Sequence, residues 1–192
     1  MSLLIAGVVL WSILHLVPAI ARPLRQTMID RVGEKAYRGL FSLSMLLTLS
    51  MIVFGWRSTH DVYLYQLPVW TRQAGALLMI VAFILFGAAQ YPTAIKRIVR
   101  HPMLTAVVVW SVSHLLTNGS TRAMVLFGGM GIWALLEIIL INRREGAWRK
   151  PESPGIAREI RGIVISLLIF CVAFYLHKYY AGVPLIISPV LD

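Results

Sequence analysis

The stretch Arg100-His101-Pro102-Met103, which continues through Trp110-Ser111-Val112-Ser113-His114 to Asn118-Gly119, decides how this chain folds. It is an apolar segment with one histidine at its start and a second near its end. In a helix the two imidazoles are separated by a rise of about 20 Å, so they cannot ligate one metal ion together. Ser111, His114 and Asn118 follow one another at i, i+3 and i+7 and form a polar stripe on an apolar helix. Inside a membrane such a stripe needs protein, water or a cofactor as its partner.

The composition around this stretch is that of an integral membrane protein. Of the 192 residues, 58% are hydrophobic and 14% are charged, and the mean hydropathy is +0.76. A soluble domain has about 25% charged residues. The length fits a single domain, residues 1–192. The net charge of +10 does not indicate a nucleic-acid partner, because the basic residues lie between the apolar runs. The one cysteine, Cys171, leaves no partner for a disulfide and no cysteine-based zinc site.

Six apolar runs predict an all-α, polytopic membrane helix bundle with about six transmembrane helices. They cover about 2–21, 39–56, 74–90, 104–117, 123–142 and 163–181. Most approach the roughly 20 residues that a helix needs to span a bilayer, and the fourth is short unless it begins at His101. Ala19-Ile20-Ala21 resembles a signal-peptidase site, but no basic residue precedes the first run, which we expect to be retained.

The basic residues predict the orientation of the bundle. Fourteen of the 18 lysines and arginines fall in loops 22–38, 91–103 and 143–162, and four fall on the opposite side. The positive-inside rule therefore makes these three loops cytoplasmic and places both termini outside. Within the first loop, segment 24–38 is compatible with an amphipathic helix on the cytoplasmic surface of the membrane.

Four histidines and one acid lie within or at the edge of apolar runs: His15, His101, His114, His177 and Glu137. His15 and His114 are the deepest, and neutral imidazoles on two helices can hold a haem inside a bundle. A membrane histidine can equally be a hydrogen-bonded packing group. That alternative stays open for His101, which precedes a helix-starting proline, and for His177, whose neighbours are typical of an interface anchor. Glu137 is five positions from the inner end of its run and His15 is six from the inner end of its own, and this similar depth allows a contact between them.

Several common motifs are absent from the sequence. There is no CxxCH, which excludes covalent c-type haem attachment, and there is no HExxH, P-loop, GxGxxG or serine-nucleophile elbow. The residues themselves therefore leave non-covalent haem binding, partner binding and transport of a small solute as alternatives.

A set of stretches in order along nearly the whole chain resembles the NnrU family of bacterial membrane proteins. They are His15-Leu16 with Arg22, the run Gly33–Leu43, Ile95-Lys96, Arg100-His101-Pro102-Met103-Leu104, Trp110 through His114-Leu115-Leu116, Asn118-Gly119, and Leu176-His177 with Gly182-Val183. The resemblance implies a multi-pass protein of the bacterial inner (cytoplasmic) membrane. It also implies an association with denitrification, the respiration of nitrogen oxides.

The same superfamily contains 15-cis-ζ-carotene isomerase, a haem b enzyme, and this relationship implies specific roles. Its haem-ligating histidines match His15 and His114 of this chain. The isomerase has a cysteine three residues before the second histidine, where this chain has Ser111, so a thiolate ligand switch is not expected here. Ser111, Asn118 and Glu137 are then expected as neighbours that tune the iron, and His101 and His177 are second-choice ligands.

The resemblance thus favours a haem b protein that binds iron non-covalently in the helix bundle. Its role would be redox chemistry linked to nitrogen-oxide respiration, or haem-dependent isomerisation of an apolar polyene substrate. The rival function is a non-enzymatic assembly or maturation factor for a respiratory membrane partner, and a third is a small-solute carrier. In each case the lipid bilayer is a partner and nucleic acid is not.

Overall fold

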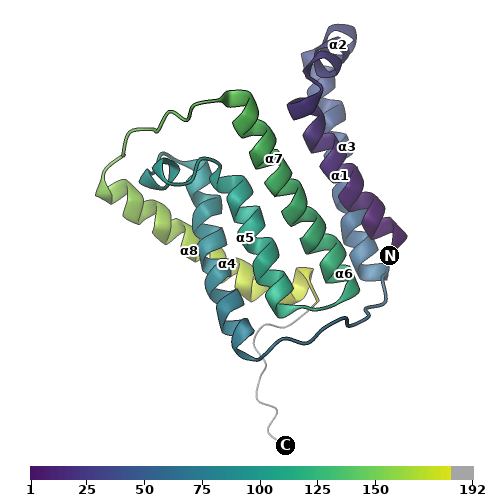
Figure 1. Cartoon of the computed structure of the whole chain (residues 1–192), viewed down its shortest axis with the longest axis vertical. Helices are drawn as coiled ribbons and strands as arrows, with labels where there is room; N and C mark the ends of the chain where they lie inside the picture. Colours follow the sequence, from purple (N-terminus) through teal and green to yellow (C-terminus); the bar gives the residue numbers. More distant parts are fainter. Residues whose placement is uncertain (183–192) are drawn as a thin grey trace, which may run out of the picture.

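The computed structural model describes residues 1–182 and is helical over most of that range (Figure 1). Val183, which is part of the family resemblance, lies outside the described residues. So does the C-terminus at Asp192, which the sequence analysis places outside the membrane. The elements are α1 (Ser2–Ile20), α2 (Arg22–Val32), α3 (Glu34–Ser58), α4 (Trp70–Gln90), the 3₁₀ turn η1 (Ala94–Arg97), α5 (Pro102–Thr117), α6 (Thr121–Ala123), the π-helical segment η2 (Met124–Gly128), α7 (Gly129–Glu145) and α8 (Ile156–Tyr180). The predicted all-α fold is confirmed, and the six apolar runs coincide with α1, α3, α4, α5, α7 and α8.

The long helices pack side by side in an order that differs from their order in the chain. Helix α7 lies between α1 and α5 (Figure 1). On one side of this centre α1 packs against α3, and on the other side α5 packs against α4, which in turn contacts α8. Helices α3 and α8 leave many large apolar side chains exposed, such as Leu43, Phe54 and Leu168, as expected for faces that contact lipid.

Four of the six expected transmembrane helices are long and apolar enough to cross a membrane by themselves. By length and composition α3, α4, the continuous helix Thr121–Glu145 and α8 are each able to cross a membrane. Helix α1 meets the same criterion only together with α2, from which it is separated by a bend of 87°. Helix α5 has 16 residues, a rise of about 24 Å against a hydrocarbon thickness of about 30 Å. It begins at Pro102, because proline fits the first turn, and it packs between α4 and α7.

The bend after α1 converts the first cytoplasmic loop of the prediction into a surface helix. Helix α2 begins with Pro23 in its first turn and ends at Val32, before Gly33, whose φ of 82° suits glycine. The remainder of segment 24–38 is the first turn of α3. A separate helix is therefore present in this segment, but it covers residues 22–32 only.

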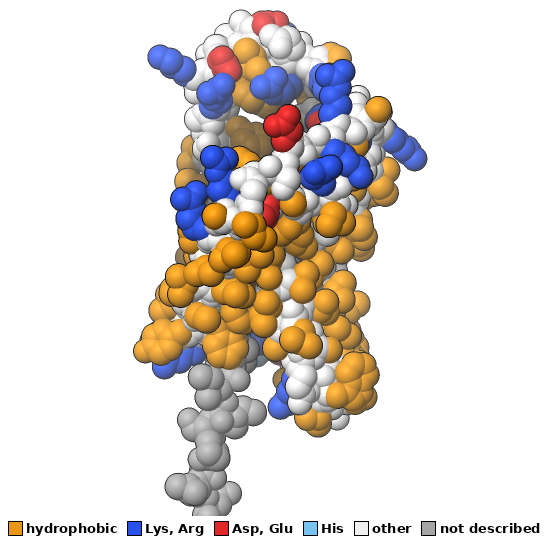
Figure 2. Space-filling view, turned by 90° about the vertical axis from the view of Figure 1, so that its left-hand side faces the viewer, with side chains coloured by type: hydrophobic (Ala, Val, Ile, Leu, Met, Phe, Trp, Pro, Cys, Tyr) orange, Lys and Arg blue, Asp and Glu red, His pale blue; other side chains and the backbone are white. Residues whose placement is uncertain are grey.

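Basic side chains gather at one end of the bundle (Figure 2). Helix α2, the turn η1 and the connection from α7 to α8 lie at that end in Figure 1, and these are the three loops that carry most lysines and arginines. The two ends of the bundle thus differ in charge, while the surface between them is largely hydrophobic (Figure 2).

The opposite end is closed by the segment between α3 and α4, which fixes the end of α5. Leu64 N–H donates to the Gly119 carbonyl over 2.8 Å, and the Tyr65 hydroxyl donates to the Leu115 carbonyl over 2.8 Å. Arg122 and Asp61 form an ion pair of 2.9 Å between two largely buried side chains. These contacts hold the last turn of α5, which carries His114.

Glu159 joins α8 to the η1 turn at the basic end. Its carboxylate accepts a hydrogen bond from the Thr93 hydroxyl over 2.6 Å and another from the Ala94 N–H. Thr93 is fully buried, so these bonds are shielded from water. We expect Glu159→Ala to lower the free energy of unfolding by about 3 kcal/mol, since hydrogen bonds to charged groups contribute roughly 1.5–3 kcal/mol each.

Circular dichroism, recorded while the protein unfolds in mixed micelles, measures this loss of stability. The matched control is Glu152→Ala, which removes an exposed acid from the connection before α8. An equal loss in both variants would contradict the assignment of Glu159 as a clamp.

Candidate functional site

His15 lies among aromatic rings from three helices. Its imidazole is 4.4 Å from the Trp11 ring on α1, 5.0 Å from Trp133 on α7 and 6.1 Å from Phe41 on α3, measured between centroids. Its Nδ1 atom is 3.0 Å from the Trp11 carbonyl oxygen. Because a carbonyl only accepts, Nδ1 carries the proton, and Nε2 presents a lone pair.

His114 is built in the same way at another place in the bundle. Its Nδ1–H donates to the Trp110 carbonyl over 2.9 Å, so its Nε2 also presents a lone pair. The imidazole is stacked on Phe127 at 4.2 Å and 20°, and the Trp110 ring lies 5.0 Å away. Phe127 belongs to η2, a π-helical segment of the kind often found at functional sites.

His177 of α8 has an electrostatic interaction with His114 of α5. Each of the two histidines lies in the last turn of its helix.

His15 and His114, by contrast, lie on different sides of α7. His15 contacts Trp133 and His114 contacts Phe127, and these positions are separated by about 9 Å along the helix and roughly a third of a turn around it. Trp133 lies in α7 and Phe127 in the preceding η2 segment, so this continuous helix stands between the helices that carry the two imidazoles. Each imidazole has the chemistry of a haem ligand.

Ser111 and Asn118 have different surroundings. The Ser111 hydroxyl is buried against Gly131 of α7, where an added Cβ would be 3.1 Å from Ser111 Cβ, and it has no hydrogen-bond partner within residues 1–182. An unsatisfied buried hydroxyl requires an explanation, and a ligand is one. Asn118 ends α5, and its backbone N–H donates to the His114 carbonyl over 2.8 Å.

Glu137 belongs to a group of unsatisfied polar atoms near His15. Its Oε2 atom and the ring nitrogens of Trp11 and Trp133 are buried without a hydrogen-bond partner in the described part of the chain. Glu137 follows Trp133 by one helical turn and so shares its face of α7. No hydrogen bond joins Glu137 to His15 or to Arg22 within residues 1–182.

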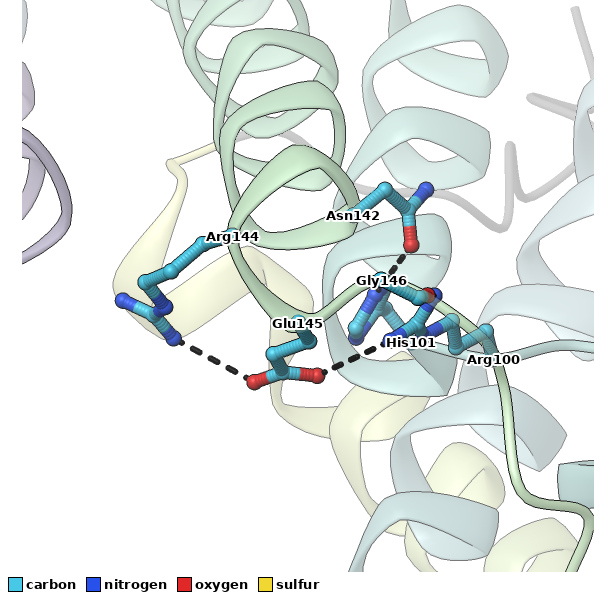
Figure 3. Close-up of polar contacts among 6 residues, drawn as sticks. All are labelled: Arg100, His101, Asn142, Arg144, Glu145 and Gly146. Atoms are coloured by element: carbon cyan, nitrogen blue, oxygen red, sulfur yellow. Dashed lines mark hydrogen bonds and ion pairs between the residues drawn. The ribbon is translucent and has the colours of Figure 1, made fainter.

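His101 lies in a polar cluster between α5 and α7 (Figure 3). Its Nε2 atom is 2.9 Å from the Asn142 side-chain oxygen. Next to it Arg100 donates to the Gly146 carbonyl over 2.8 Å and to Glu145 over 3.2 Å, and Arg144 reaches the same carboxylate over 3.3 Å. These contacts close the end of α7 and give His101 a structural role. Among residues 1–182 no three His, Cys, Asp or Glu side chains are grouped to hold a metal ion.

Sequence reasoning missed the aromatic partners of the two deep histidines, although a signal for them exists. The pattern Trp-Ser-x-x-His-Leu occurs at 11–16 and again at 110–115. In both copies the tryptophan supplies the carbonyl that fixes the imidazole and a ring beside it. Phe127 and Trp133, in contrast, come from another part of the chain and contact the histidines only because the helices pack together.

One family model, described as NnrU protein, matches residues 3–185 and thus nearly the whole chain. No curated protein and no solved structure matches the chain.

Proposed function

Because this chain belongs to the NnrU family, we propose that it is a membrane haem b protein whose iron is held by Nε2 of His114. The observation that carries the proposal is the fixed tautomer of His114. Its Nδ1–H is bonded to the Trp110 carbonyl, so the ring is oriented and the other nitrogen is available as a ligand. Haem-ligating histidines are commonly held in this way by a second hydrogen bond.

The family resemblance and the electrostatics of His114 point to different histidines as the second haem ligand. The resemblance implies His15, whereas the electrostatic interaction with His114 comes from His177. His15 and His177 are therefore the two candidates that would hold the haem together with His114, and substitution of each histidine distinguishes between them.

The chain's own residues have defined tasks in this proposal. Phe127 stacks on the imidazole and holds its plane, and Trp110 adds a second aromatic wall that excludes water. The Ser111 hydroxyl, buried and unpartnered one turn before His114, is available to donate a hydrogen bond to a ligand. Bound haem would supply one-electron redox chemistry, its potential depending on such hydrogen bonds and on burial.

The proposed haem protein would carry out either redox chemistry in nitrogen-oxide respiration or isomerisation of an apolar polyene. An apolar cavity of about 300 Å³ is lined by Phe83, Phe86, Gly87, Gln90, Met103, Ser166 and Ile169. It meets α5 at Met103, which is about 16 Å along the helix from His114. A small substrate in this cavity would not touch the imidazole.

The colour of the protein purified in mild detergent tests the proposal. A Soret band at about one haem per chain is expected, extracted as unmodified haem b because no CxxCH is present. A colourless chain, prepared from cells with sufficient haem, would contradict it and favour the assembly-factor function.

The orientation of the protein is a further part of the proposal. Since the basic end should face the cytoplasm of a bacterial inner membrane, a reporter active only in the periplasm is expected to be silent when fused near Glu152. The same reporter fused after Asp192 is expected to be active. The reverse pattern would invert the topology.

A further inference from the structure

A charged cavity lies inside the bend between α1 and α2, where these helices meet the end of α7. Its volume is about 590 Å³, and its lining consists of Pro18, Arg22, Pro23, Arg25, Gln26 and Arg144. Three guanidinium groups from two separate parts of the chain thus face one space at the basic end of the molecule (Figure 2). No acidic residue lines the cavity.

The positive charge of this cavity is poorly balanced by the protein. The Arg22 side chain has no hydrogen bond or ion pair within residues 1–182, and Arg25 makes a cation–π contact of 5.5 Å with Tyr37. Arg144 has one carboxylate partner, Glu145, which also binds Arg100 (Figure 3). Arg144 also interacts electrostatically with Glu137. Two acids are fewer than the four arginines at this end, Arg22, Arg25, Arg100 and Arg144, so a positive charge remains and the cavity is suited to an anion.

Helix α2 sets the depth of the cavity in the membrane. It leaves α1 at 87°, and Leu24, Met28 and Val32 form an exposed apolar stripe at i, i+4 and i+8. A helix perpendicular to a span, with such a stripe, lies in the interface and faces the hydrocarbon with its apolar side. With α2 in the interface, the arginines beside it would lie at the level of the lipid phosphates.

We propose that this cavity, which we call the arginine pocket, binds a phosphate group. Guanidinium groups bind phosphate oxygens in a bidentate manner, and Arg22 and Arg144 approach from different helices. Pro18 and Pro23 offer an apolar wall to the carbon part of a phosphodiester. The phosphate belongs to an anionic phospholipid or to a soluble phosphate, and the inference does not depend on haem.

The test uses the full chain in nanodiscs of phosphatidylcholine that contain a minor fraction of phosphatidylglycerol. Native mass spectrometry then measures how many phosphatidylglycerol molecules stay bound. Arg22→Gln with Arg144→Gln is expected to weaken retention roughly 100-fold, about tenfold for each hydrogen bond between a guanidinium and the phosphate that is lost. The charge-matched control, Arg31→Gln with Arg143→Gln, removes two nearby arginines that do not line the pocket.

The source of the phosphate is decided by competition. Preferential retention of phosphatidylglycerol that millimolar inorganic phosphate does not displace assigns the pocket to a lipid. Binding of inorganic phosphate, without any preference for phosphatidylglycerol, assigns it to a soluble ligand. Equal weakening in the pocket and control variants means that only surface charge is involved, and this overturns the proposal.

A measurement on the unmodified chain covers the case in which the pocket variant does not fold. Phenylglyoxal labels accessible arginines, and peptide mass spectrometry locates the label. Phosphatidylglycerol or inorganic phosphate should protect Arg22, Arg25 and Arg144 but leave Arg31 and Arg143 reactive. Uniform labelling of all five with either ligand would also overturn the proposal.

Discussion

His114→Ala is expected to lower the haem content of the purified protein roughly tenfold or more. Loss of a hydrogen-bond partner behind a metal ligand already reduces affinity by about 10–100-fold, so loss of the ligand itself should do at least as much. The absorbance of the Soret band per chain measures the effect. His114→Ala should keep the helix, because alanine has a high helix propensity. Circular dichroism of the variant checks this.

Two further histidine variants locate the second axial ligand. If His177 is the second ligand, His177→Ala should change a six-coordinate haem spectrum into a five-coordinate one, and His15→Ala should leave both spectrum and haem content unchanged. The opposite pattern would restore the ligand pair implied by the family resemblance. His60→Ala is the neutral control, since His60 is exposed on the loop after α3. Retention of full haem content by His114→Ala would refute the site.

Gly55→Ala is expected to lower the free energy of unfolding by about 1–3 kcal/mol. A Cβ at Gly55 would lie 2.5 Å from the Leu4 backbone nitrogen and 2.6 Å from its Cα. Backbone atoms cannot rotate away, so α1 and α3 would have to separate at their contact. Leu4 is fully buried there, and its packing with Ile52 would be disturbed. Small residues at such a contact are what allow membrane helices to approach closely.

Gly39→Ala is the matched control for this prediction. Gly39 lies in the same helix, and an added Cβ would meet no atom within 4 Å. Alanine should be neutral or slightly stabilising there, because it favours the helix by up to about 1 kcal/mol over glycine. Unfolding in mixed micelles compares the two variants. Equal stability of both would show that α1 and α3 are not in close contact at Gly55.

Only the candidate ligands of the site could be predicted from the sequence. His15, His114 and Glu137 are conspicuous because ionisable groups are rare in apolar runs. Which of them approach one another depends on the helix order, which the sequence does not specify. In the structure α7 lies between α1, which carries His15, and α5, which carries His114, and Glu137 makes no hydrogen bond to His15.

The sequence by itself determined the class of the protein, because hydropathy and run length report directly on the solvent that each segment requires. It also determined the polarity of the bundle, since basic residues accumulate in alternate loops. Only the tertiary structure decided that α1 bends by 87° into a surface helix, and that α5 is a short helix between two others. It alone placed Phe127 on His114 and three arginines around one cavity. The reason is physical: lipid-facing and protein-facing positions are both apolar, so the sequence pattern specifies which segments are buried in the membrane but not which of them touch.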